Sequence, residues 1–488
     1  MKAGKREIRK DGIRRALSGE GYYPRRAAGA AGVWRGSAAL ALLCTLVSYP
    51  GIWYSDSYVR VTTGGAVLNA VVKALTGHRI LLETHNAFSV IPSFFMAASI
   101  GLTGHVGLYT FLQAFAFFSA VFLLIRELKP AYRKLQYLLF ALSPVIFGAS
   151  VYYEANIGSA AGMIALLLLF RRVREEKTRA ERGIEFLLIA FASFVTFGYR
   201  TNALTVVPVL AVYLWKTRTE KTRKVLPALA LVCGLLLVKA VPWAFGVKSL
   251  SNGGTGFVWE IITTIQRMDP SDRAAYEDYL DDIGGEGATA AVLQSSTEAS
   301  ANDFMWGGAL NAETMSAPGA MSGILGKYFR LIREKPADWL RVKGDFLRRA
   351  MGIGEALDIS EYDYNRWDAM GEYGLNDSLQ RKWFHASYLG MNRVFGFFTL
   401  HPWASFLISL ILVSAEWIRK SGKRELYALL MWTAVFYYGA YLAVIVGFEL
   451  RFFYPSLLLM MIMDASIVLD WVKSGAALLR RKTARRRP

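Results

Sequence analysis

Long runs of apolar residues, separated by short basic segments, dominate the pattern along this chain. Uncharged runs that approach the length of a membrane span recur many times. A helix needs about 20 such residues to cross about 30 Å of hydrocarbon. Because a soluble protein of 488 residues rarely repeats such runs, the pattern predicts an all-α polytopic membrane protein.

Ten of these runs are predicted to be membrane-spanning helices. They are residues 34–54, 105–125, 137–150, 158–170, 186–198, 203–215, 225–245, 404–417, 426–447 and 452–472. Basic loops of multi-pass proteins face the cytoplasm. This bias places both termini, the basic tails 1–33 and 475–488, inside a multi-pass protein of the cell membrane. The first span is interpreted as an uncleaved signal anchor.

A hydrophilic stretch divides the apolar runs into two groups. Residues 34–246 form an N-terminal transmembrane module, and residues 386–474 hold the C-terminal transmembrane helices. Between them, residues 247–385 follow an outward span and are therefore predicted to be extracytoplasmic. Within that segment, residues 284–320 are rich in Gly, Ala and Ser, which predicts a flexible loop. The helical spacing of apolar residues in ILGKYFRLIREKPADWLRVKGDFLRRA, broken at Pro336, predicts two amphipathic helices.

The region after the first span does not read as a simple loop. Residues 59–77 carry valines along one helical face, which predicts an amphipathic helix lying in the membrane interface. Residues 87–103 are apolar but short and contain Pro92, so a second juxtamembrane helix is predicted there. A full crossing at this point is the alternative. It would put the basic segment 126–134 outside, so charge bias favours the interfacial helix.

The formal charge of +19 is concentrated in the membrane part of the chain. Residues 247–385 contain 21 acidic and 14 basic residues, which leaves 43 basic and 17 acidic of the totals of 57 and 38 for the remainder. No basic groove with stacking aromatics is visible, so nucleic acid is discounted as a partner. Cys44 and Cys233 lie inside apolar runs and show neither a disulfide framework nor metal-ligand spacing.

Polar residues are unevenly divided between the two predicted sides of the membrane. The outer ends of the spans hold Asp56, Arg60, Glu83, His85, Asn86, Glu154, Asn156, Arg200, Asn202, Glu449 and Arg451. Ionisable residues at span ends cost free energy and often mark function. Arginine binds phosphate well and a carboxylate accepts a proton, so this group suits a phosphate-bearing substrate.

The first outer loop resembles that of the GT-C superfamily of integral membrane glycosyltransferases, which includes protein mannosyltransferases and aminoarabinose transferases. In that family an acidic residue follows the first span, as Asp56 does in YSDSY. Two juxtamembrane helices precede the second span, as predicted at 59–77 and 87–103. The segment THNAFSVIPSFFMAASIGLTGHVGLYTFLQAF is similar to the family's apolar helix, Gly-bearing break and new span.

Two further features extend the resemblance over most of the chain. Glu154 in YYEAN matches a second acidic residue outside the third span. FELRFFYPSLLLM matches an Arg-aromatic-x-x-Pro pattern that heads a late span, here with Arg451 and Pro455. The chain departs from the family where His-Pro is expected, because His85 is followed by Asn86, and no second acid stands beside the one after the first span.

The resemblance implies transfer of a sugar from a polyprenyl-phosphate carrier to an acceptor glycan, lipid or protein at the outer face of the membrane. It implies that Asp56 is the general base or orients the acceptor. Glu154 would support it or bind a divalent metal, and whether a metal or any other cofactor is used stays open. The polyprenyl tail of such a donor would lie between helices in the lipid bilayer.

The resemblance also implies roles for the basic residues. Arg200 and Arg451 would hold the departing phosphate, whose charge grows as the glycosidic bond breaks. His85 would contact either substrate, and Arg60 is a further substrate-binding candidate close behind Asp56. The alternative for the arginines is an anchoring role, with side chains that extend from the apolar region to water.

A transporter or flippase of lipid-linked or polysaccharide precursors is the alternative function. Such a protein places charged residues or broken helices near the midplane, often in paired repeats. No internal repeat is visible, and the polar residues gather at one face, which favours the enzyme. A membrane scaffold without catalytic activity is a third interpretation.

Overall fold

The computed structural model describes residues 23–49, 51, 55–76, 89–152, 155–172, 178–217, 221–247, 254–298, 301, 304, 308–359 and 379–484. Within these residues the regular structure is helical, apart from an isolated bridge between Asp358 and Glu449 and a bridge residue at Tyr152. The all-α class predicted from the sequence is confirmed for the described part of the chain.

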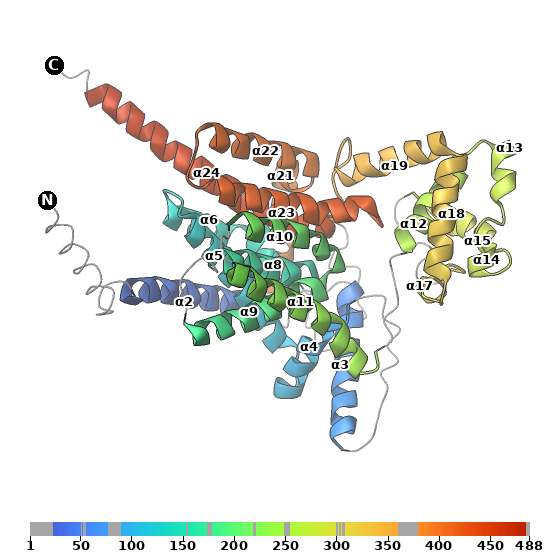
Figure 1. The fold of residues 1–488 in the computed structure, drawn as a ribbon, viewed down its shortest axis with the longest axis horizontal. Coiled ribbons are helices and arrows are strands. Elements are labelled where there is room, and N and C mark those ends of the chain that lie inside the picture. The colour runs from blue at the N-terminus through green and yellow to red at the C-terminus, as the bar shows by residue number, and fades with distance from the viewer. Residues whose placement is uncertain are drawn as a thin grey trace.

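An apolar helix bundle makes up most of the molecule (Figure 1). Its helices are α2 (Tyr23–Ser48), α5 (Gly107–Leu128), α6 (Arg133–Leu142), α7 (Pro144–Ala149), α8 (Ala155–Arg172), α9 (Arg179–Tyr199), the 3-10 helix η1 (Thr201–Val206), α10 (Val207–Thr217), α11 (Lys221–Ala244), α20 (Leu379–Val394), α21 (Gly396–Thr399), α22 (Pro402–Ile418), α23 (Arg424–Ala443) and α24 (Leu450–Ala484). Among the described residues, five stretches are long and apolar enough to cross a membrane: Ala31–Ser48, Gly107–Leu128, Val225–Ala244, Arg424–Ala443 and Leu450–Ala477. These five support a helical membrane protein.

Four of the other five predicted spans correspond to shorter or interrupted helices. The fifth, 186–198, lies within the 21-residue helix α9, which is not among the five spanning stretches. Ala155–Arg171, Thr201–Lys216 and Pro402–Ile418 are apolar but shorter than 18 residues. The predicted span at 137–150 is divided between α6 and α7. Ser143, between them, is extended because a following proline disfavours the helical conformation. Neither α6 nor α7 is long enough to cross the hydrocarbon by itself.

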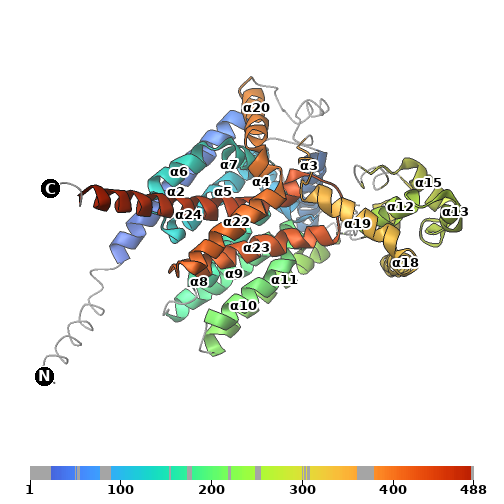
Figure 2. The same ribbon diagram turned by 90° about the horizontal axis from the view of Figure 1, so that it is seen from above.

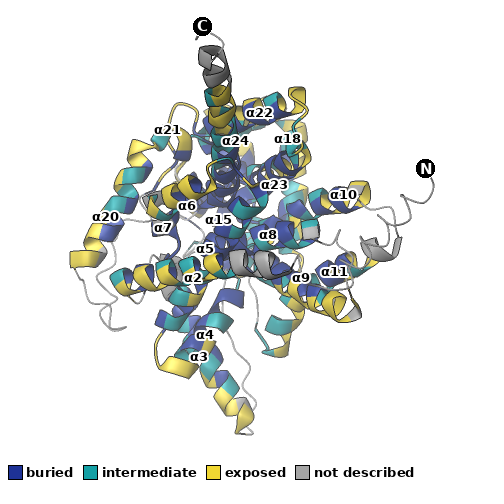
Figure 3. Cartoon of the chain, turned by 90° about the vertical axis from the view of Figure 1, so that its left-hand side faces the viewer, coloured by how far each residue is buried: buried dark blue, intermediate teal, exposed yellow. Residues whose placement is uncertain are grey.

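Helix α8 lies at the centre of the bundle. It packs against α5, α9 and α24, and most of its described side chains are buried. Seen from the end of the molecule where α2 begins and α24 ends, buried faces turn towards the centre and exposed faces of α2, α11 and α20 turn outwards (Figure 3). The exposed side chains of α11 include Leu229, Val232 and Leu236, which suit a helix that faces lipid.

Two helices occupy the region where juxtamembrane helices were predicted, namely α3 (Ser55–Leu75) and α4 (Ile91–Thr103). They pack closely, since a Cβ added at Gly64 of α3 would lie 3.1 Å from the carbonyl oxygen of Ser93 of α4. The 13 residues of α4 rise about 20 Å, which is less than the thickness of the hydrocarbon. Their position relative to the membrane stays a prediction.

The described residues between 254 and 359, called the hydrophilic segment below, form a second group of helices. These are α12 (Thr255–Gln266), α13 (Pro270–Arg273), η2 (Ala274–Tyr276), α14 (Asp281–Gly284), α15 (Ala288–Ser295), α17 (Ala312–Met315), α18 (Ala320–Glu334) and α19 (Pro336–Ala350). Both views place α12 to α18 at the opposite end of the molecule from the start of α2 and the end of α24 (Figures 1 and 2).

Two expectations about this segment can be compared with the structure. The pair of amphipathic helices separated at Pro336 is confirmed as α18 and α19, which bury Tyr328 and Phe346 and pack on α12. The stretch 284–320 was expected to be a loop, but it contains α15 and α17. Val292 of α15 is fully buried, and this burial stabilises a helix that the Gly-rich and Ser-rich composition did not suggest.

Candidate functional site

The structure describes the side chains of three of the six predicted site residues. Arg60 and Arg451 are buried, and Arg200 is half-buried. Asp56 belongs to the first turn of α3, but its side chain lies outside the described residues. Glu154 and His85 lie outside them entirely.

Arg200 directly follows helix α9 and is positioned by close packing of α9 on α8. A Cβ at Gly158 would lie 2.1 Å from the ring of Tyr199, and one at Gly162 would lie 2.5 Å from Oγ1 of Thr196. Two glycines four residues apart therefore allow α9 to approach α8 closely. The following helix η1 packs on α23, where the hydroxyl of Thr205 donates to the Phe436 carbonyl at 2.7 Å.

Arg451 lies in the first turn of α24 and forms an ion pair with Glu449. Both side chains are only 9% exposed. Pro455 lacks the N–H that would otherwise bond to the Arg451 carbonyl, so the first turn of this helix lacks that one intrahelical hydrogen bond. Glu449 was among the outer polar residues of the sequence, but its pairing with Arg451 was not predicted.

The two arginines meet at one aromatic ring. The guanidinium carbon of Arg451 lies 5.0 Å from the centroid of the Phe452 ring, and that of Arg200 lies 5.7 Å from the same centroid. Tyr441 stacks on this ring, with 4.5 Å between centroids and 11° between planes. These five residues, Arg200, Tyr441, Glu449, Arg451 and Phe452, are called the arginine cluster below.

The arginine cluster is suited to hold an anion. It carries two guanidinium groups and one carboxylate, so its formal charge is positive. Each guanidinium has five N–H donors in a planar fork that can bind phosphate oxygens in pairs. Contact with the face of an aromatic ring stabilises a cation without using those donors.

Arg60 belongs to a second polar group that adjoins the arginine cluster. Its charge acts on the phenol of Tyr199, the residue that precedes Arg200. The hydroxyl oxygens of Tyr199 and Tyr109 lie 3.4 Å apart, and Tyr109 donates to Gln113 at 2.9 Å. Gln113 in turn donates to the carbonyl oxygens at 150 and 152, at 2.9 and 2.7 Å. This chain of contacts connects Tyr199 with residues 150–152, which precede α8.

A buried tyrosine–histidine pair near this turn was not identified from the sequence. The hydroxyl oxygen of Tyr152 lies 2.6 Å from Nδ1 of His385 on α20, and both residues are buried. Tyr388, one turn later on α20, packs on the Tyr152 ring at 4.9 Å between centroids. Nothing in the local sequence of either segment indicates this long-range pairing.

An acidic residue in the middle of α24 was also overlooked. Asp464 lies halfway along the apolar stretch Leu450–Ala477 and accepts a hydrogen bond of 2.7 Å from Ser409 on α22. Its other oxygen, Oδ1, is buried and has no hydrogen-bond partner among the described residues. The sequence signal was available, because a lone acid within MMIMDASIV is unusual in a membrane span.

No group of three or more His, Cys, Asp or Glu side chains among the described residues could hold a metal ion. The pair considered from the sequence, Asp56 and Glu154, falls outside the side chains that the structure describes.

Comparison of the chain with known proteins finds no matching family model, no matching curated protein and no matching solved structure.

Proposed function

We propose that the chain is a GT-C-type membrane glycosyltransferase. It moves a sugar from a polyprenyl-phosphate carrier to an acceptor glycan, lipid or protein at the outer face of the membrane. The observation that supports this best is the meeting of Arg200 and Arg451 at Phe452, from helices far apart in the sequence. Two guanidinium groups at one point suit the phosphate of such a donor.

The proposal includes a membrane orientation. Ten spans would place both termini in the cytoplasm and the hydrophilic segment outside the cell membrane. The five long apolar helices support part of this count, and the shorter ones would supply most of the rest. The start of α2 and the end of α24 lie at one end of the molecule and the hydrophilic segment at the other, as this orientation requires (Figures 1 and 2).

In the proposed reaction an acceptor hydroxyl attacks the anomeric carbon of the sugar. The bond from that carbon to the phosphate oxygen breaks, and its electrons leave with the polyprenyl phosphate. Arg200 and Arg451 stabilise the charge that develops on this phosphate. Asp56 takes the proton of the acceptor hydroxyl. Arg60 follows Asp56 by four residues, so both belong to the same face of α3.

The decisive experiment tests transfer directly. The purified full chain, reconstituted in lipid, is given a panel of polyprenyl-phosphate sugars and candidate acceptors. Asp56→Asn is compared with the wild type and with Glu277→Gln, an exposed acid of the hydrophilic segment. Sugar transfer that Asp56→Asn abolishes and Glu277→Gln retains supports the proposal. Absence of transfer across the panel, or full activity of Asp56→Asn, rejects it.

The position of Asp464 favours one alternative, a transporter or flippase of lipid-linked precursors. Transporters place ionisable residues near the bilayer midplane, and Asp464 lies halfway along its apolar stretch. Vesicles that contain the chain and a labelled polyprenyl-phosphate sugar distinguish the two functions. Movement of the label between leaflets without sugar transfer, lost in Asp464→Asn, favours the alternative.

A further inference from the structure

The connection between α23 and α24, residues 444–449, lies against the hydrophilic segment. The Asp358 N–H donates to the Phe448 carbonyl at 2.7 Å, and the Leu450 N–H donates to the Asp358 carbonyl at 3.0 Å. Nearer the start of the connection, the N–H of Ala301 donates to the Val446 carbonyl at 3.2 Å. The backbone of the connection is thus bonded to two separate parts of the hydrophilic segment.

Aromatic and charged side chains of the hydrophilic segment surround Phe448. The ring centroids of Trp259 and Phe346 lie 5.5 and 5.7 Å from that of Phe448. The guanidinium carbon of Arg349 lies 4.2 Å from the same centroid. Phe448 is therefore held in an aromatic pocket that belongs to α12 and α19.

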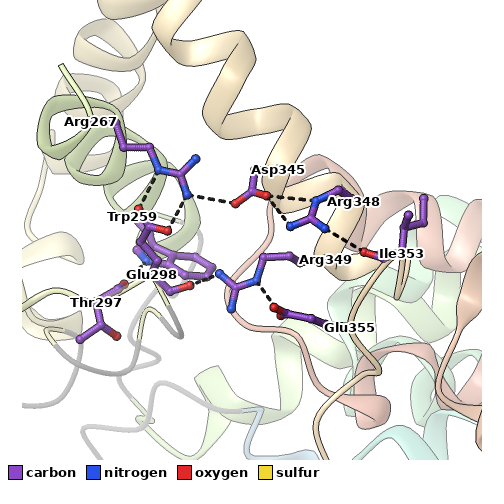
Figure 4. A network of polar contacts seen from close by, with 9 residues as sticks. All are labelled: Trp259, Arg267, Thr297, Glu298, Asp345, Arg348, Arg349, Ile353 and Glu355. Atoms are coloured by element: carbon purple, nitrogen blue, oxygen red, sulfur yellow. Dashed lines mark hydrogen bonds and ion pairs between the residues drawn. The ribbon is translucent and has the colours of Figure 1, made fainter. Parts of the chain in front are cut away.

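Arg349 itself is fixed by a network of polar contacts (Figure 4). It donates to the Glu298 carbonyl at 2.5 Å and pairs with Glu355 at 3.7 Å. The Glu298 carboxylate binds Arg267, which also pairs with Asp345 of α19 at 3.0 Å. The position of Arg349 over Phe448 thus depends on α12, α19 and the turn at 298.

Lys343 makes the second attachment, at the end of α23. Its ammonium donates to Glu260 at 2.5 Å and to the Ala443 carbonyl at 2.9 Å. The Lys343 side chain is 13% exposed and that of Glu260 is 1% exposed. Tyr328 donates to the second oxygen of Glu260 at 2.6 Å. A cation at the last carbonyl groups of a helix is stabilised by the helix dipole, so this contact fixes where α23 ends.

These contacts act on the arginine cluster through Leu450. Leu450 is the first residue of α24, and the Asp358 carbonyl accepts its otherwise unpaired N–H. The ion-paired residues Glu449 and Arg451 flank Leu450 on either side. A shift of the connection would therefore change the direction in which the Arg451 side chain leaves α24.

We propose that Lys343 and Arg349 are positioning residues for Arg451. By attaching residues 443–450 to α12 and α19, they hold the arginine cluster in the geometry that binds the donor phosphate. The catalytic part of this inference rests on the proposed glycosyltransferase function. The structural part, that these two side chains immobilise the connection, does not.

Two variants of the full chain test the inference, each with a matched control. Lys343→Met and Arg349→Gln remove the attachments. Lys327→Met and Arg330→Gln, both on α18, remove an ion pair with Asp282 at 3.2 Å and one with Glu334 at 2.8 Å, neither of which touches the connection. Because Lys343→Met leaves the buried Glu260 without its cation, the double variant Glu260→Gln/Lys343→Met is measured beside it.

The first readout is amide hydrogen exchange of the peptides that cover residues 444–451. Exchange there should quicken at least about tenfold in both test variants, because local opening becomes easier, while the controls stay near the wild type. Unchanged exchange in Arg349→Gln and in the double variant overturns the positioning role, whether or not the protein transfers sugar.

The second readout separates positioning from loss of folded protein. Arg451 holds the phosphate of the bound donor as well as the charge that develops in the transition state, so its misplacement should raise KM for the donor at least about fivefold, in addition to any fall in kcat. A smaller folded fraction lowers kcat and leaves KM unaltered. Faster exchange with an unaltered donor KM overturns the link to Arg451. Failure of the wild type to transfer sugar rejects the proposed function, and faster exchange in that case still supports the positioning of the connection.

Discussion

Two regions of the bundle place ionisable side chains in apolar surroundings, and they do so differently. At the end that faces the hydrophilic segment, Arg451 has an ion pair with Glu449 and shares the ring of Phe452 with Arg200. In the middle, Asp464 has a hydrogen bond from Ser409, and its Oδ1 atom has no hydrogen-bond partner among the described residues.

The difference indicates that buried polar side chains have two separate roles in this membrane bundle. A cation is stable in apolar surroundings when an opposite charge and aromatic rings compensate its lost hydration. The arginine cluster has both, and its two guanidinium groups suit an anionic substrate. A single hydroxyl–carboxyl contact between α22 and α24 is instead typical of helix–helix association in membranes. Five predictions test this contrast.

The largest effect is expected from Arg451→Gln. The change removes a donor that stabilises charge in the transition state, so kcat/KM for sugar transfer should fall about 10²–10³-fold. Steady-state kinetics with a polyprenyl-phosphate sugar measures it. The double variant Glu449→Gln/Arg451→Gln controls for the buried carboxylate that the single change leaves without its cation. Activity above a tenth of the wild-type value in both variants would contradict the functional role assigned to the arginine cluster.

Arg200→Gln should have the second largest effect, a fall of about 10–100-fold in kcat/KM. The effect is smaller because Arg200 is half-buried, so that water weakens its interaction with an anion. Arg200→Lys keeps the charge but loses the planar fork and should recover part of the activity. Equal activity of the Gln and Lys variants would show that the charge of Arg200 is not used.

Gly158→Ala should destabilise the end of the bundle by about 1–3 kcal/mol, because its Cβ overlaps the ring of Tyr199. The displaced ring would also move Arg200. Thermal unfolding in detergent measures the loss. Gly183→Ala on α9 is the matched control, since nothing lies within 4 Å of its added Cβ. That control should be neutral or slightly stabilising, and equal loss in both variants would contradict the packing argument.

Acid should loosen the hydrophilic segment and leave the centre of the bundle unchanged. Hydrogen bonding to Arg267 holds the pKa of Glu298 below its usual range. A carboxyl group whose pKa is lower in the folded state stabilises that state above its unfolded pKa, about 4.3 for Glu, and loses this contribution as pH falls through the folded pKa.

Amide exchange, corrected for its intrinsic pH dependence, checks the acid prediction between about pH 5 and pH 3. Peptides around residue 298 should lose protection over this range. Peptides from residues 159–170 of α8, which contain no ionisable side chain, serve as the reference. Equal loss in both regions would mean that Glu298 does not control the local stability.

The smallest effect is expected from Asp464→Asn. An amide can still accept the hydrogen bond from Ser409, so sugar transfer should change by less than about twofold. Leu457→Asn, which introduces an amide at another buried position of α24, is expected to destabilise the protein more. Loss of sugar transfer or of lipid movement in Asp464→Asn alone would indicate that the functional centre lies in the middle of the bundle and not at its end.

The sequence alone was sufficient for the helical class and for some local features. Apolar runs of spanning length are read directly, because hydrocarbon leaves few alternatives to a helix. Pro336 likewise marked the boundary between α18 and α19. Pro144 could be read from the sequence as directly as Pro336. The pattern of apolar residues around it, however, does not show whether two short helices together form one span.

The candidate site was predictable only in outline. Charge bias assigned Arg200 and Arg451 to the same side, because it sums over whole loops and needs no knowledge of packing. The tertiary structure decided which residues meet: Arg451 with Glu449, both arginines with Phe452, and Tyr152 with His385. Such contacts depend on which helices are neighbours and on how each is rotated. The hydrophobic pattern of one helix shows which face is buried but does not identify the helix that covers it.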